Sequence, residues 1–547
     1  MNASNSLPFL SALVWTPFIG ALLLYLFPKG QGSRVSFWLT LVVTFIELGL
    51  SLGVAARFTV GDGGLQLTEQ FRWIEEIGVW YALGIDGISL SLLLLTVFLT
   101  PIILLVSSPS IRYQRDYFAA FLCLEGSVVA AILALDLFLF YLAWELMLIP
   151  AYFLIGIWGE GDKLRATQKF LVYTVGGSIF MLVAILYTVW TYADQSGEVS
   201  FLFRDLLNVR LTSVEQWWLY GAFALAMAVK IPLFPFHTWL PTTYSAASPP
   251  VAAFLAGVLS KMGLYGLVRF ALPLFPLGGA AWADVLAVLA VMGIIYGALI
   301  AWIQTDFVRL ISFSSISHLG FCVLGAVVLN GVSTTGLMVQ MVSHGLTTAA
   351  LFLIAGMLIE RVGSRDLVSF GGLSGQMPLA AVMLMLVTLA AVSLPFTSSF
   401  VGEFLILGGA FNQYPVLVGL ALMGVILSAV YMLHLYKAVM FGPRRVQHIE
   451  AVNTRSGSSF DISVVEITGI VPVIFLVIFI GCFPQYLIDV VRPSVNVLIK
   501  ATERRGRVLD RYDRYLDRNQ RGHGDDIDFV ARPVSFISSL VSGSESK

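Results

Sequence analysis

Fourteen stretches of mostly apolar residues follow one another along this chain. Each is about 20 residues long, which is the length that an α-helix needs to cross the hydrocarbon core of a membrane. Only 12% of the residues are charged, whereas a soluble domain carries about 25%. The sequence therefore predicts an all-α polytopic membrane protein with fourteen transmembrane helices, over residues 7–27, 35–56, 87–106, 118–135, 137–158, 170–192, 217–239, 250–272, 283–303, 310–329, 336–359, 379–408, 416–441 and 464–490. Predicted helices four and five are almost continuous, so only a tight turn near Asp136 can join them.

The basic residues of the predicted loops are divided unevenly between the two sides of the membrane. Thirteen lie in the loops of one side; on the other side four lie in loops and a fifth, Arg269, lies close to the end of a span. The positive-inside rule therefore places the first side in the cytoplasm. Both termini then lie on the periplasmic or lumenal side. The arginines from Arg504 to Arg521 disagree with this orientation, but they alternate with aspartates and follow the last span. The first span lacks a basic leader and a small-residue cleavage site, so we expect it to remain as a helix.

Composition and motifs exclude several classes of function. The formal net charge is -1, and no basic stripe interleaved with aromatic residues occurs before the tail, so we expect no nucleic-acid partner. The three cysteines are far apart in apolar runs, which excludes a metal or iron–sulfur spacing. There is also no glycine-rich phosphate loop. We therefore expect no metal site and no cofactor in this chain.

Ionisable residues inside the spans are the candidates for function. A lysine at mid-bilayer depth costs roughly 2.5–3.5 kcal/mol, so its presence needs a reason. A structural salt bridge is the plain alternative for the glutamate of helix five, and a packing role is the plain alternative for each histidine. Two histidines in successive helices among serines and threonines favour a shared role. The candidates are Glu145, Lys230, Lys261, His318, His344 and Glu403.

Prolines interrupt two of the spans beside such residues. Lys230 precedes Pro232 in predicted helix seven, and Glu403 follows Pro395 in predicted helix twelve. Broken helices at membrane depth occur where they line protein or water. Helices four to eight and nine to thirteen thus form two five-helix blocks with corresponding breaks, which predicts inverted repeats. The expected division is 1–117 for helices one to three and an interfacial loop, 118–272 and 283–441 for the repeats, 464–491 for helix fourteen, and 492–547 for a charged tail.

The charges of these residues indicate proton transfer rather than covalent chemistry. A buried lysine holds or releases a proton according to the position of a neighbouring carboxylate. Glu145 and Lys230 are expected to form such a switch. Lys261 would store the proton in the middle of the membrane, His318 and His344 would connect it to Glu403, and Glu403 would be the last site.

Five segments carry a specific resemblance to a known family. They are WELMLIP (144–150), KIPLFPFHTWLP (230–241), LAGVLSKMGLYG (255–266), SSISHLG (314–320) and MVSHGL (341–346). The chain resembles the antiporter-like membrane subunits of respiratory complex I, most of all chain four, including the cyanobacterial and plastid NAD(P)H dehydrogenase versions. The resemblance implies a fourteen-helix subunit without a cofactor of its own. Iron–sulfur clusters and quinone would belong to partner subunits, whose electron transfer drives proton translocation at a distance.

The same resemblance assigns the relay residues. The family's glutamate of helix five falls on Glu145, its two lysines on Lys230 and Lys261, and its glutamate of helix twelve on Glu403. Its histidines fall on His318 and His344. Sister subunits have lysine in helix twelve, so the glutamate there points to chain four.

The chain departs from the family pattern after the broken helix seven. Thr242, Tyr244 and Ala246 stand where ionisable residues are common. This departure suggests a cyanobacterial paralogue of a carbon dioxide uptake complex, with a hydration subunit as partner, in the thylakoid membrane; a bacterial inner membrane is the alternative location. Two other functions remain open, namely a subunit of a multisubunit sodium/proton antiporter and a structural scaffold.

Two segments outside the spans are expected to have defined structure. Residues 496–519 predict a surface helix that could bind a partner subunit, with a solvated tail as the alternative. The segment 59–86 mixes glycines with Trp73, Trp80 and Tyr81. It predicts an ordered loop with aromatic anchors at the membrane interface.

Overall fold

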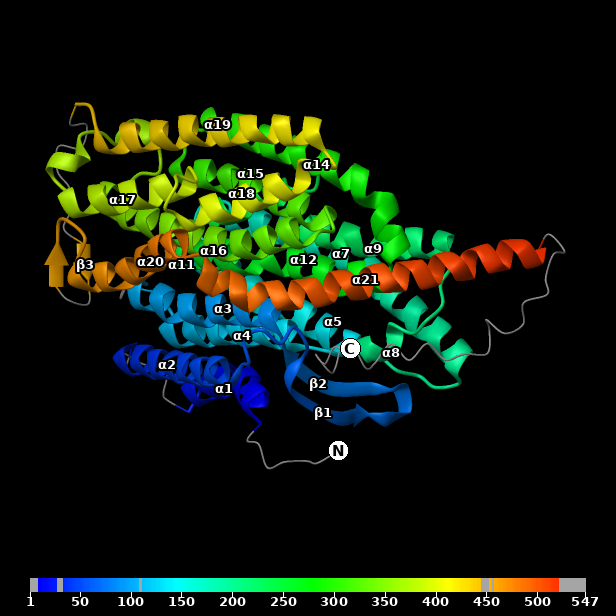
Figure 1. The fold of residues 1–547 in the computed structure, drawn as a ribbon. Helices are drawn as coiled ribbons and strands as arrows, with labels where there is room; N and C mark the ends of the chain where they lie inside the picture. The colour runs from blue at the N-terminus through cyan, green and yellow to red at the C-terminus, as the bar shows by residue number, and fades with distance from the viewer. Residues whose placement is uncertain (1–7, 27–32, 108–110, 444–451, 455–456, 521–547) are drawn as a thin grey trace.

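The computed structural model describes residues 8–26, 33–107, 111–443, 452–454 and 457–520. Most of these residues lie in helices that run side by side as one bundle (Figure 1). Helices α1 and α2 lie at one edge of the bundle and α19 at the opposite edge, while α21 runs along its flank and extends past it. The first helices and the later helices therefore lie on opposite margins of one body.

Eleven helical segments of the described residues are long and apolar enough to cross a membrane. Each agrees with a predicted span. They are α2 (Ser33–Arg57), α3 (Gly87–Val106), α4 (Gln114–Leu133), α5 with α6 (Leu137–Leu146 and Leu148–Trp158), α7 (Lys163–Ser196), α11 to α13 (Pro249–Phe254, Lys261–Gly266 and Leu272–Leu274), α14 (Pro276–Trp302), α15 (Phe307–Val327), α16 (Gly331–Val362), α19 (Pro415–Met440) and α20 (Val464–Cys482).

The other three predicted spans are shorter or interrupted. The first is α1 (Phe9–Leu24); the seventh is α9 (Ser213–Lys230) followed by α10 (Trp239–Ala246); the twelfth is α17 (Pro378–Ala391) followed by α18 (Ser398–Ala410). The two predicted breaks are therefore confirmed. Pro232 and Pro395 cannot donate a backbone hydrogen bond, and each lies in one of the gaps. The total of fourteen spans and the inverted repeats stay predictions.

The segment 59–86, which predicts an ordered interfacial loop in an all-α chain, contains a β-hairpin. Strands β1 (Gln66–Ile74) and β2 (Val79–Ile85) pair antiparallel in the segment that was expected to be an interfacial loop. Residues that favour strands, among them Phe71, Trp73 and Tyr81, support this pairing, and Gly78 turns the chain with a φ of 69°. The carboxylate of Glu69 accepts hydrogen bonds from the backbone of Leu10 and Ser11, so the hairpin also caps α1. A second small pair is β3 (Val452–Thr454) with β4 (Gly457–Ser459).

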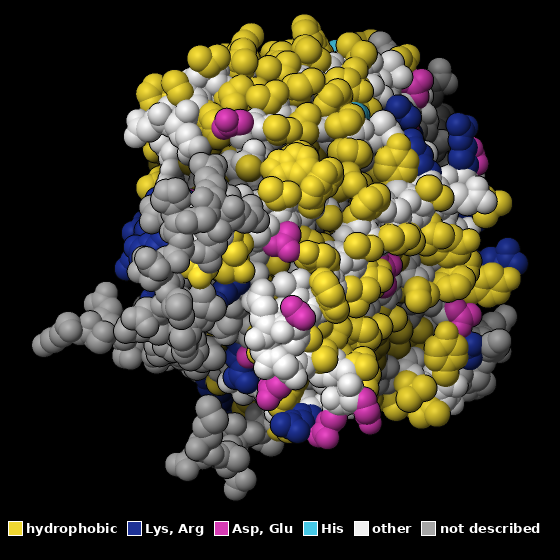
Figure 2. Space-filling view, turned by 90° about the vertical axis from the view of Figure 1, so that its right-hand side faces the viewer, with side chains coloured by type: hydrophobic (Ala, Val, Ile, Leu, Met, Phe, Trp, Pro, Cys, Tyr) yellow, Lys and Arg dark blue, Asp and Glu magenta, His cyan; other side chains and the backbone are white. Residues whose placement is uncertain are grey.

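The outer surface of the bundle is apolar. Val172 and Trp190 on α7 and Ile426 on α19 are each about two-thirds exposed. Figure 2 shows a face on which hydrophobic side chains predominate, with Lys and Arg toward its margins and a few acidic side chains among the hydrophobic ones. Soluble monomers do not expose apolar surface on this scale. The surface is that of a protein that lies in lipid.

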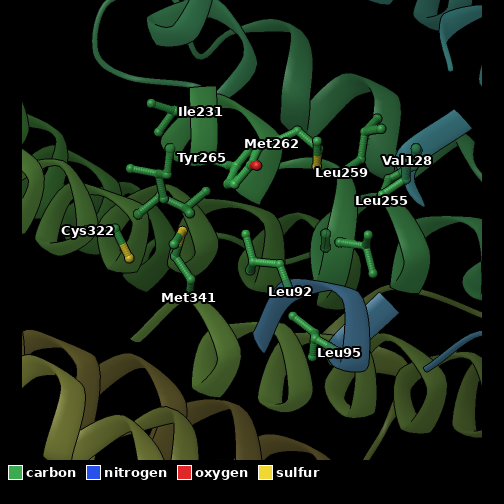
Figure 3. Packing of buried hydrophobic residues seen from close by; sticks show 14 of the residues in the cluster. Leu92, Leu95, Val128, Ile231, Leu255, Leu259, Met262, Tyr265, Cys322 and Met341 are labelled. Carbon is green, nitrogen blue, oxygen red and sulfur yellow. The ribbon is translucent and has the colours of Figure 1, made fainter. Parts of the chain in front are cut away.

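The α11–α13 segment (Pro249–Leu274) is buried except at its two prolines at the start, and α15 is buried except at Arg309. In Figure 3 its side chains lie among residues of α3, α4, α15 and α16; those labelled are Leu92, Leu95, Val128, Ile231, Leu255, Leu259, Met262, Tyr265, Cys322 and Met341. The predicted helix with Lys261 is thus the centre of the bundle.

Helix α21 (Gln485–Gln520) is longer and more firmly held than the predicted surface helix. The side chain of Arg505 is buried and donates hydrogen bonds to the carbonyl oxygens of Val209 and Leu274. Ser213 also bonds to Asp513. The predicted helix over 496–519 is therefore confirmed, and Arg505 fixes it to the bundle. Docking to a partner subunit stays a prediction, and residues 521–547 lie outside the described residues. The remaining short elements are α8 (Phe203–Leu206) and three 3₁₀ turns at Glu75–Ile77, Leu367–Ser369 and Leu373–Gly375.

Asp136 forms the predicted tight turn between α4 and α5. One carboxylate oxygen accepts from the backbone N–H groups of Phe138 and Leu139, at 2.9 and 3.0 Å, and the other accepts from Trp80 at 3.1 Å. The side chain caps α5 and ties the turn to strand β2. Burial raises the pKa of Asp136 to about 6, and these hydrogen bonds offset only part of the rise.

We expect Asp136 to make the stability of the protein depend on pH. A carboxyl whose pKa is higher in the folded state than its unfolded value of about 3.9 contributes stability that is fully present below about pH 4. That contribution is lost as the pH rises through about 6. Melting temperatures measured across this range should fall in the wild type, and Asp136→Asn should remove that slope. Asp194→Asn, at an exposed site on α7, is the control and should keep it.

Candidate proton relay

Glu145 and Lys230 lie close together at the start of the candidate relay. Glu145 is in the last turn of α5, and Lys230 is the last residue of α9, directly before the break. Lys230 is 1% exposed, and its Nζ lies 4.9 Å from the ring of Trp144, the residue before Glu145. Glu145 acts on Lys230 electrostatically. Within the described residues Nζ of Lys230 makes no hydrogen bond, and Oε1 of Glu145 makes none either.

Lys261 is held by an irregular helix. Two π-helical segments, Leu255–Leu259 and Leu267–Ala271, flank the turn of α12 that carries it. The N–H of Ser260 bonds to the carbonyl of Leu255, five residues earlier, and Nζ of Lys261 donates to the carbonyl of Ala256. Widened turns of this kind are rare and occur often at functional sites. Here the local helix geometry lets a carbonyl oxygen receive the buried ammonium group.

Four of the six predicted residues lie in series, with a hydrogen-bond distance at each end and the two histidine rings as neighbours between them. Nζ of Lys261 lies 2.8 Å from Nδ1 of His344. The ring centroids of His344 and His318 are 5.9 Å apart. Nδ1 of His318 lies 2.8 Å from Oε1 of Glu403. The chain crosses α12, α16, α15 and α18, which are neighbours in space but far apart in sequence.

Several polar residues that sequence reasoning missed support this chain. Gln340 donates from Nε2 to Oε1 of Glu403 at 3.0 Å, Ser315 lies 3.2 Å from Nε2 of His344, and Tyr431 lies 3.4 Å from Nε2 of His318. Cys322 also interacts electrostatically with Lys261. A signal existed for Gln340, because it lies one helical turn before His344 and so on the same face of the helix.

The Glu145–Lys230 pair meets the four-residue chain where α9 packs on α12. A Cβ added at Gly263 would lie 2.7 Å from the side chain of Ile231, 3.0 Å from the carbonyl oxygen of Met227 and 3.1 Å from the backbone nitrogen of Ile231. Glycine therefore permits the close approach of these two helices. Lys230 and Lys261 are not joined by a hydrogen bond within the described residues.

Thr242, Tyr244 and Ala246 lie on α10, outside the chain of contacts, and Tyr244 borders a cavity. Tyr244 is 1% exposed and packs edge-on against Phe352. A cavity of about 540 Å³ borders Tyr244 and is also lined by Glu160 and Arg365, which form an ion pair at 2.6 Å. In the described part of the chain, no three His, Cys, Asp or Glu side chains gather as a metal site would require.

Comparison with known proteins places the chain in a family. Residues 134–429, which include all six candidate relay residues, match the model of the family described as NADH:quinone oxidoreductase/Mrp antiporter, transmembrane region. The chain belongs to this family. NADH-quinone oxidoreductase subunit M of Rickettsia prowazekii is 35% identical over 500 residues, which cover 90% of this chain and 99% of that subunit. Subunit M of Mycobacterium tuberculosis is 37% identical over 531 residues, which cover 90% and 94%.

Solved structures of this family share the fold. A chain of respiratory complex I from Thermus thermophilus superposes with a TM-score of 0.80 at 30% identity, and the match covers 90% of this chain and 99% of that one. A chain of the Mrp complex from a Dietzia species superposes with a TM-score of 0.77 at 20% identity, over 91% of this chain and 99% of that one. The second similarity bears on the fold alone. The resemblance to antiporter-like subunits of complex I is thus confirmed at the level of the family.

Proposed function

We propose that this chain is a proton-translocating, antiporter-like membrane subunit of an NADH–quinone oxidoreductase, of the chain-four type. The observation that carries the proposal is the buried chain of contacts from Lys261 through His344 and His318 to Glu403. Buried ionisable residues at membrane depth mark proton paths when they are arranged in series. Electron transfer, iron–sulfur clusters and quinone belong to partner subunits.

In this proposal the histidines pass protons between their two ring nitrogens. An imidazole can take a proton on one nitrogen and release one from the other. Nδ1 of His344 faces Lys261 and its Nε2 faces Ser315, which lies on the same helix as His318. Nδ1 of His318 faces Glu403, whose carboxylate Gln340 orients by a hydrogen bond. The chain can thus move a proton from the Lys261 ammonium to the Glu403 carboxylate.

Glu145 controls whether Lys230 keeps its proton. The two side chains interact without a hydrogen bond, so a small movement of either one changes the charge balance at Lys230. The break after α9 supplies a place where such movement does not disrupt helical hydrogen bonds. Release of a proton at Lys230 toward Lys261 would then load the four-residue chain.

The proposed setting is a bacterial inner membrane. The loops that carry thirteen basic residues are proposed to face the cytoplasm, which leaves both termini on the periplasmic side. The corresponding breaks after α9 and α17 support two inverted repeats, 118–272 and 283–441. Partners are neighbouring antiporter-like subunits, the other membrane subunits and the hydrophilic arm.

The alternative functions have weaker support. A cyanobacterial complex for carbon dioxide uptake in the thylakoid membrane, reducing plastoquinone and carrying a hydration subunit, rests only on Thr242, Tyr244 and Ala246. The relatives compared above are subunits of NADH-quinone oxidoreductases from other bacteria. A sodium/proton antiporter subunit rests on a shared fold at 20% identity.

Mass spectrometry of the complex, purified from gently solubilised membranes through a tag on this chain, tests the proposed function. Recovery of dehydrogenase subunits of the membrane and of the hydrophilic arm is expected. A small set of antiporter subunits without redox partners would replace the proposal by sodium/proton exchange. An additional hydration subunit would instead favour carbon dioxide uptake. The untagged strain, processed in the same way, is the control.

A further inference from the structure

Two buried glutamates lie outside the candidate relay, and neither has a cation beside it. Glu47 lies near the middle of α2 and Glu125 near the middle of α4, and both side chains are 0% exposed. All four of their carboxyl oxygens lack a hydrogen-bond partner among the described residues. Isolated buried carboxylates are very costly, so this arrangement needs an explanation.

The two carboxyl groups face one another between closely packed helices. Each is an electrostatic neighbour of the other, and the hydroxyl of Thr100 on α3 is the remaining polar neighbour of Glu125. Helices α2 and α4 pack against each other, and α1 packs on both. A Cβ at Gly20 of α1 would lie 2.6 Å from Val43 of α2, and one at Gly126 of α4 would lie 2.9 Å from Phe18 of α1. The packing therefore brings two acidic groups together in an apolar layer.

No positive charge in this layer balances the pair. Helices α1 and α3, which pack against α2 and α4, contain no charged residue. The basic residues of α2 and α4 are Arg34, Arg57 and Arg115, all at the ends of their helices. Arg34 precedes Glu47 by about 20 Å along the helix. Asp116, Tyr117 and Cys123 are the other titratable groups on α4. Neither Arg57 nor Arg115 is an electrostatic neighbour of Glu47 or Glu125, and nor is Lys261 of α12, which also packs against α4.

Two carboxylates in one apolar site cannot both ionise at moderate cost. Like charges at short range repel, and burial disfavours each charged form. The least costly arrangement is one in which a carboxyl donates its proton to the neighbouring carboxylate, as carboxylate pairs in proteins do. This arrangement also supplies the hydrogen bond that the oxygens otherwise lack.

We propose that Glu47 and Glu125 form a second proton-binding site of this chain, in which two carboxyl groups hold a proton between them. The ligand is a proton, not a metal ion. The site lies one helix away from the relay, because α4 also packs against α12, and Leu99, next to Thr100, contacts the position of Gly257 in the helix that carries Lys261. This inference does not depend on the proposed function.

Labelling of the intact complex with a lipid-soluble carbodiimide tests the site, since the reagent modifies protonated carboxyl groups in apolar surroundings. We expect mass spectrometry to find label on Glu47 or Glu125 at about pH 6, and at least about fivefold less label at about pH 9. Absence of label at the lower pH, or equal label at both, would overturn the proposal. Protection by sodium ions without any dependence on pH would assign the site to a metal cation and would overturn it as well.

A variant tests whether the two groups act together. Glu125→Gln removes the neighbouring charge but keeps the size of the side chain, so the midpoint of Glu47 labelling should move down by about one pH unit or more. An unchanged midpoint would contradict a shared proton. Glu76→Gln, at an exposed carboxyl between β1 and β2, is the control and should leave the Glu47 curve where it is. If the Glu125 variant does not assemble, the wild-type labelling curve decides.

Discussion

Replacement of Lys230 by alanine is expected to leave the complex assembled and to lower coupled proton transfer by roughly tenfold or more. Its ammonium group is buried over Trp144, is influenced by Glu145 and makes no hydrogen bond within the described residues, so its loss removes no structural contact of that kind. Proton uptake driven by NADH in inverted membrane vesicles, normalised to the amount of complex, measures the effect. Lys437→Ala, at an exposed lysine on α19, is the control and should pump normally.

The Glu145→Ala variant separates a relay from a scaffold. If Glu145 and Lys230 act as one unit, each single variant and the double variant should lose a similar amount of coupled proton transfer, and the two losses should not add. A double variant that assembles and pumps at the wild-type rate would exclude this pair from the relay. Loss of assembly with normal turnover of the remaining complex would instead favour the structural role.

Replacement of Arg361 by methionine is expected to destabilise the protein by about 3–5 kcal/mol. The guanidinium of Arg361 is buried at the end of α16 and bonds to both carboxylate oxygens of Glu466, at 3.0 and 2.8 Å. It also bonds to the carbonyl oxygens of Met357 and Asp461. Without it, the negative charge of Glu466 would remain buried beside α16 with no cation, and only the N–H of Ser463 would still bond to it.

Thermal unfolding of the purified complex measures this loss. Adding Glu466→Gln to the Arg361 variant should restore part of the stability, because it removes the uncompensated charge. Arg309→Met, at an exposed arginine that bonds to Gln304, is the control and should change stability little. Equal melting temperatures for the Arg361 and Arg309 variants would contradict the expected role of the ion pair.

The helices and their breaks were predictable because each is a local property of the sequence. Apolar runs of the right length located the spans, Pro232 and Pro395 located the breaks, and Asp136 located the turn between α4 and α5. The β1–β2 hairpin was not predicted, since most of β1 is exposed and its pattern differs little from that of an ordered loop. The extent of α21 depends on Arg505, whose partners lie more than 200 residues earlier.

The candidate site was predictable as a set of residues but not as an arrangement. Lys261 and His344 are 83 residues apart, and His318 and Glu403 are 85 apart, so only the fold brings their atoms together. Gln340 was missed because an uncharged amide costs less to bury than a lysine does. Glu47 and Glu125 are single acidic residues in apolar runs, and their pairing across α2 and α4 has no local signal.

Gly263 sets the distance between α9, which ends in Lys230, and α12, which carries Lys261, because its side chain is a single hydrogen atom. Any larger side chain would meet the backbone of Ile231, the residue after Lys230, and of Met227, one helical turn before it. A methyl group there would push the helix that carries Lys261 away from the end of α9, with no change to any ionisable group. Proton transfer falls steeply with separation, so the chain tolerates little growth at this contact. Gly263 thus influences the rate of the proposed proton transfer from Lys230 to Lys261, although it cannot itself carry a proton.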